Sequence, residues 1–82
     1  MGAARVLRDA VAHLEEGDWQ AAHAIVQQDE ESPLFCWAHG IVHVMEGDLP
    51  NARYWYGEAK RDFPVDYSVA GELAALKRAL AG

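Results

Sequence analysis

The chain has one cysteine, three prolines and no long apolar run, and these shortages exclude several classes of protein. A single thiol, Cys36, leaves no partner for an intramolecular disulfide, which excludes the small secreted scaffolds that depend on disulfides. The longest apolar stretch is far below the roughly 20 residues that a membrane-spanning helix needs. We also expect no secretory signal at the N-terminus. Together these features favour a cytoplasmic protein.

Positive charge is scarce as well. Seven Lys and Arg stand against 13 Asp and Glu, so the formal net charge is −6, and no basic stripe exists to neutralise phosphates. We therefore expect neither nucleic acid nor a membrane as a partner. What the chain does have is 51% hydrophobic residues, which excludes disorder, and a length of 82 residues, which suits one domain.

A short internal repeat is the most informative feature present. The segment 16–22 (EGDWQAA) returns as 46–52 (EGDLPNA), a spacing of 30 residues that is typical of stacked helical units. In each copy the Gly can take the left-handed conformation that ends one helix, and the Asp can cap the next. Each copy therefore predicts two antiparallel helices joined by a short turn.

Apolar residues at helical spacing predict five helices and no strand. Ser32 is a suitable N-cap with Pro33 at the first helical position, and Pro64 marks a stop. The expected helices cover about residues 3–16, 18–28, 33–46, 49–62 and 67–80. The predicted fold class is all-α, a single domain over residues 1–82 with hairpins at about 3–28 and 33–63 and a C-terminal capping helix at about 67–80.

The second hairpin resembles a tetratricopeptide repeat. The residues that fall on motif positions are Gly40, Gly47, Asp48, Ala52, Tyr56, Ala59 and Pro64. The first hairpin matches in part, through Gly17, Asp18, Trp19 and Ala22, and the whole resemblance covers about residues 3 to 64. It implies paired helices around a concave groove that receives a partner protein or peptide. The segment 39–56 also resembles small proteins of unassigned function, which implies no chemistry.

One face of the third expected helix carries potential metal ligands. Cys36, His39, His43 and Glu46 lie at offsets of 0, 3, 7 and 10, and imidazoles four residues apart can share a metal. The tetratricopeptide register instead places Cys36, His39, Gly40 and His43 against the partner helix of their own hairpin, as core residues with hydrogen-bonded imidazoles. This structural interpretation is the favoured one. We expect no metal and no cofactor, with Cys36, His39, His43 and Glu46 as the alternative ligand set. His23 has no second ligand near it in sequence and is expected at the surface.

The same face offers two possible catalytic pairs, but the sequence lacks the other groups that a catalytic site needs. Cys36 with His39, or Glu46 with His43, would give a nucleophile or an acid beside a base. No oxyanion hole, phosphate loop or third orienting group accompanies either pair. An enzyme is therefore less favoured than a binding protein.

The third helix is apolar on its other face too, through Leu34, Trp37, Ile41, Val44 and Met45. Either the last helix folds over this face or another chain covers it, because large apolar patches are seldom left open to water. Two repeats are fewer than the three or so that solenoids need, which predicts a homodimer through the first and third helices. Tyr54, beside Arg53, is expected to be exposed, either at an interface or across its own hairpin.

The predicted function is accordingly that of a protein–protein interaction or self-association module. Its partner-binding residues are predicted to be Leu34, Trp37, Ile41, Val44, Met45 and Tyr54. The alternative is a small-ligand or metal-binding protein that uses the polar face around His39 and His43.

Overall fold

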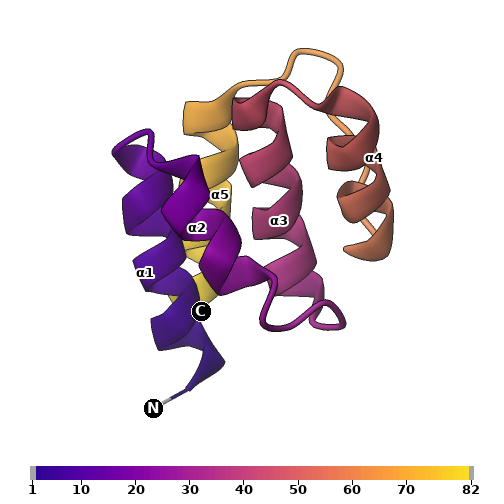
Figure 1. The fold of residues 1–82 in the computed structure, drawn as a ribbon. Helices are drawn as coiled ribbons and strands as arrows, with labels where there is room; N and C mark the ends of the chain where they lie inside the picture. Colours follow the sequence, from indigo (N-terminus) through magenta and orange to yellow (C-terminus); the bar gives the residue numbers. More distant parts are fainter. Residues whose placement is uncertain (1, 82) are drawn as a thin grey trace.

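The computed structural model describes residues 2–81, which form five α-helices and no strand (Figure 1). The helices are α1 (Ala3–Glu15), α2 (Trp19–Val26), α3 (Pro33–Glu46), α4 (Leu49–Glu58) and α5 (Val69–Ala81). The predicted all-α class with about five helices is thus confirmed. Within the described range, none of these helices has the length and apolar character that crossing a membrane requires.

The repeated Glu-Gly-Asp sequence makes the same turn twice. Gly17 and Gly47 both adopt the left-handed conformation, with φ of 81° and 94°. The Asp that follows each glycine caps the next helix, because Oδ1 of Asp18 and of Asp48 accepts a hydrogen bond from the backbone N–H three residues on, at 3.1 and 3.3 Å. The turn chemistry predicted from the repeat therefore sets the start of both α2 and α4.

The ends of α2 and α4 come earlier than the sequence pattern predicts. α4 ends at Glu58, four residues before the expected position 62. Lys60 takes a left-handed conformation with φ of 60°, which no helix can contain. Ser68 then caps α5, since its Oγ accepts a hydrogen bond from the Gly71 N–H at 3.0 Å.

α3 is the central helix, and the other four arrange themselves around it. α2 and α5 both pack against α1 and α3, and in Figure 1 α5 lies behind α2, so these two helices cover opposite sides of the α1–α3 pair. The backbone of α4 lies close to that of α3, and α4 reaches α5 through the side chain of Tyr56. As a result nine consecutive residues of α3, from 35 to 43, are buried.

The close contact between α3 and α4 depends on Gly40. A Cβ atom at this position would lie 2.5 Å from Cδ1 of Tyr56 and 3.2 Å from the carbonyl oxygen of Ala52. Tyr56 is 1% exposed and cannot move outward without breaking its packing. Glycine is therefore the residue that lets these two helices approach.

α5 covers the apolar face that the sequence leaves without a partner. Trp37 and Ile41 of α3 are 2% and 0% exposed, and α5 packs against α3. The α5 residues that are buried in this contact are Leu73, Leu76 and Leu80. Glu72 adds a polar link, because its Oε1 accepts hydrogen bonds from Trp37 Nε1 at 3.0 Å and from the Tyr56 hydroxyl at 2.5 Å. Of the two outcomes expected for this face, the structure shows the intramolecular one.

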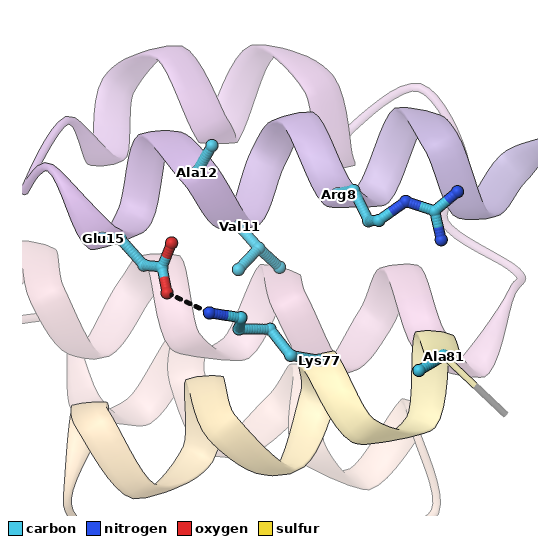
Figure 2. A pocket seen from close by; sticks show the side chains of 6 residues that line it. All are labelled: Arg8, Val11, Ala12, Glu15, Lys77 and Ala81. Carbon is cyan, nitrogen blue, oxygen red and sulfur yellow. Dashed lines mark hydrogen bonds and ion pairs between the residues drawn. The ribbon is translucent and has the colours of Figure 1, made fainter.

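A hollow of about 240 Å³ lies where α5 meets α1 (Figure 2). Val11 lies at its apolar side, and Arg8 lies nearer the end of α5 that carries Ala81. Lys77 of α5 pairs with Glu15 of α1 at 2.8 Å across it. Both partners are about half exposed, and such pairs contribute about 0–1 kcal/mol. The hollow therefore lies between two helices that are already linked by an ion pair of their own side chains.

Candidate metal centre

Three imidazoles from two different helices converge at one point of the structure. His23 comes from α2, and His39 and His43 come from α3. One ring nitrogen from each lies within 4.8 Å of the other two, and the ring centroids are 5.0 to 5.3 Å apart. This group, the histidine cluster, contains three of the four histidines of the chain; His13 is not in it.

Helix packing brings the cluster together. His39 and His43 are four residues apart on α3, so their side chains lie one turn above the other on the same face. α2 is anchored by Ala22 and Val26, which are both fully buried. His23 follows Ala22 directly and is half-buried at the edge of that contact, where it meets the two rings of α3.

His43 is oriented by a carboxylate. Its Nδ1 lies 2.7 Å from Oε1 of Glu46, so the neutral ring donates its Nδ1–H and leaves Nε2 with a free lone pair. A carboxylate that holds one imidazole nitrogen is the usual companion of a metal-ligating histidine, because it fixes both the tautomer and the ring plane.

His39 is the most deeply buried member of the cluster, at 2% exposure. Its ring stacks on Trp55 at a centroid distance of 3.9 Å and an angle of 8°, which fixes its orientation. Burial, and then the neighbouring rings of His43 and His23, lower the pKa of His39 from 6.5 to about 4. The ring is therefore neutral at pH 7, which is the form that binds metals. Its Nδ1 is buried and has no hydrogen-bond partner among the described residues.

A second group of possible ligands shares His43 but is already committed elsewhere. His43, Glu46 and Asp48 lie within 4.8 Å of one another at the α3–α4 turn. Glu46 is bonded to His43, and Asp48 caps α4 through the Asn51 N–H. These carboxylate oxygens already accept hydrogen bonds that orient His43 and cap α4, so this group is a weaker candidate for a metal site.

The alternative ligand set considered on α3 differs from the observed cluster at three residues. Cys36 does not join the cluster: its buried thiol donates to the Glu30 carbonyl oxygen at 3.3 Å. Burial, helped by nearby carboxylates, raises the pKa of this thiol. Glu46 touches His43 without joining the three nitrogens, and His23, expected at the surface, takes part instead. The clue in the sequence was Ala22, a motif position whose burial places His23 beside α3.

The predicted partner-binding residues differ in how exposed they are in the structure. Trp37 and Ile41 are buried within the chain's own core and offer no surface to a partner. Tyr54 is 57% exposed, as expected, and its ring meets Trp55 edge-on at 5.0 Å. The remaining predicted contact residues are only half-buried: Leu34, Val44 and Met45.

A hollow of about 440 Å³ lies between the α3–α4 turn and the segment that leads to α5. Leu49 and Val65, which are 43% and 99% exposed, both line it. Arg53 stands over the ring of Phe63 at 5.0 Å in its wall. This hollow is where exposed apolar side chains gather in the described part of the chain.

Comparison with known proteins gives no relative from which a function could be transferred. No family model, no curated protein and no solved structure matches the chain. The tetratricopeptide resemblance therefore stays a prediction, and function has to be argued from the geometry of the histidine cluster.

Proposed function

We propose that this chain binds one divalent transition-metal ion through His23, His39 and His43. The observation that carries the proposal is the convergence of three imidazole nitrogens within 4.8 Å, on two packed helices. Glu46 holds His43 in the tautomer that a metal needs, and Trp55 holds the plane of His39. Two of the three ligands are thus oriented in advance.

The cluster needs little movement to close around an ion. Zinc–nitrogen bonds of about 2.0–2.1 Å in a tetrahedral site place two ligand nitrogens about 3.4 Å apart. The imidazoles must therefore approach one another by up to about 1.5 Å. His23 is half-buried on the outer helix α2 and can make most of this movement by side-chain rotation.

The donor type selects the metal. Neutral imidazole nitrogens suit Zn²⁺, Ni²⁺ and Cu²⁺, whereas Mg²⁺ and Ca²⁺ prefer oxygen ligands. We expect affinity to rise from Ni²⁺ to Cu²⁺ and to fall again for Zn²⁺, which is the general order for nitrogen sites.

The competing interpretation, three imidazoles that only fill space, leaves His39 unexplained. A buried structural imidazole normally has its polar atoms satisfied. An unpaired buried nitrogen such as His39 Nδ1 typically costs about 1–3 kcal/mol. Coordination of a metal by this nitrogen would remove that cost, which a packing role does not.

Titration calorimetry with Zn²⁺ tests the proposal. His23→Ala is the variant of choice, because His23 is half-buried and its loss leaves the core intact. We expect one ion per chain and a loss of affinity of more than about 100-fold in this variant. Removal of a residue that only hydrogen-bonds to a ligand typically costs about 10–100-fold. His13→Ala, outside the cluster, is the matched control and should bind like the parent. Equal affinity in parent and His23→Ala would refute the site.

As a second candidate we propose self-association through the hollow that Leu49 and Val65 line. The interaction function predicted from sequence fits this hollow better than the α1–α3 face, because a partner there would have to displace α5. Two large exposed apolar side chains at one hollow support it. Light scattering on the parent and on Leu49→Glu tests it, and we expect a dimer that becomes a folded monomer. A parent that is monomeric at about 100 μM contradicts the proposal, because its association free energy would then be weaker than about 5.5 kcal/mol.

A further inference from the structure

The histidine cluster supplies three donors and no more. Among residues 2–81, no carboxylate or thiol lies within reach of all three imidazole nitrogens. The nearest chemical candidates are engaged elsewhere, since the Cys36 thiol is bonded to a backbone carbonyl and the Glu46 carboxylate to His43. Zinc in proteins is almost always at least four-coordinate, and closed structural sites take all four ligands from the protein. The fourth ligand of a tetrahedral ion at this site must therefore come from outside the described residues.

The charge of the donors indicates what that ligand is. Three neutral imidazoles leave the full 2+ charge of the ion uncompensated by any directly bonded group. The site is largely buried, with His39 and His43 at 2% and 7% exposure, so an unbalanced charge there is costly. The Glu46 carboxylate offsets part of it only through the His43 ring. A negatively charged fourth ligand would be bound more strongly than a neutral one of the same size.

The exposure of the three histidines indicates from which side a ligand reaches the cluster. The Trp55 ring stacks on the His39 ring, which is itself buried on α3. His23 is the half-buried member, so the way in runs beside α2. The hollows at α1–α5 and at the α3–α4 turn are lined by other residues.

Building on the metal-binding function proposed above, we propose that the three-histidine centre is an open site whose fourth ligand is a small exogenous anion. The three donors, the uncompensated charge and the burial of His39 and His43 each support this. The chain would then present an ion that captures a small anion, in contrast to a structural metal that only holds two hairpins together.

Cobalt(II) in place of zinc gives a direct test, because its visible d–d bands report the ligands around it. The parent loaded with one equivalent of Co²⁺ is titrated with sodium azide, with His13→Ala as the matched control. We expect a d–d band from bound Co²⁺ that shifts in position and intensity in a saturable way as azide binds. The same change is expected in His13→Ala.

The outcomes separate this inference from the proposal beneath it. A d–d band that appears with one equivalent of Co²⁺ but does not respond to azide, even in large excess, overturns the open site and leaves metal binding intact. A band that is absent in parent and control overturns both. A band that persists unchanged in His23→Ala shows that Co²⁺ is bound by other residues, which also overturns both.

Discussion

The pH dependence of the metal-free protein should report the burial of His39. Because the pKa of His39 is lowered from 6.5 to about 4, the unfolded chain binds a proton at this residue between these pH values and the folded chain does not. Stability rises with pH wherever the unfolded state binds more protons. The contribution of His39 to stability is therefore intact above about pH 6.5 and is lost as the pH falls towards 4.

The size of the effect follows from the shift. One pKa unit corresponds to about 1.36 kcal/mol, so the whole shift would amount to about 3 kcal/mol. Solvent reaches the cluster on the side of half-buried His23 and screens part of this, so we expect about 2 kcal/mol. For a domain of this size, 2 kcal/mol is a large share of the total stability.

Urea unfolding between pH 7.5 and 4, with a chelator present, measures this effect. Carboxylates also titrate in this range, so the useful quantity is the difference between variants. His39→Gln keeps a polar side chain but removes the titration, and its loss of stability on acidification should be about 2 kcal/mol smaller than that of the parent. His13→Gln should behave like the parent. Identical pH dependence in parent and His39→Gln would refute the reasoning.

Three further predictions concern the packing and the site. Gly40→Ala should lower the free energy of unfolding by about 1–3 kcal/mol in urea titrations, because the new methyl group collides with Tyr56; an unchanged midpoint would contradict the helix contact. Glu46→Ala should weaken Zn²⁺ binding by about 10–100-fold in calorimetry, because His43 loses its orienting partner; unchanged affinity would remove Glu46 from the site. Zn²⁺ at 100 times its Kd should stabilise the parent by about 2.7 kcal/mol and raise its Tm, with no such rise in His23→Ala.

Local chemistry explains why the sequence predicts most of the fold. A left-handed glycine and a capping Asp depend on neighbours within four residues, so both turns could be read from the repeat. The end of α4 could not, because nothing in the apolar pattern indicates that Lys60 takes a left-handed conformation. That residue ends the helix through the path of the chain towards α5, which is a tertiary effect.

The sequence predicted two of the three histidines of the candidate site, and helix geometry explains why the third was missed. His39 and His43 are four residues apart, about 6 Å along the axis, and can share an ion. Cys36 lies on the same face as His43 but seven residues away, about 10.5 Å along the axis, which is too far for one ion. His23 is separated from His39 by 16 residues of sequence, and only the packing of α2 on α3 brings the two rings together.

The position of the cluster ties metal binding to the integrity of the fold. His23 belongs to the first hairpin and the other two ligands to the second, so all three meet only when the hairpins are packed. α2 is the shortest helix described, with 8 residues, and helices of this length are not stable alone in water. An ion at the cluster would attach α2 to the most buried helix of the molecule, and its binding free energy would add to the free energy of unfolding. An anion at the fourth position would then act on an ion held by the contact between the two repeats.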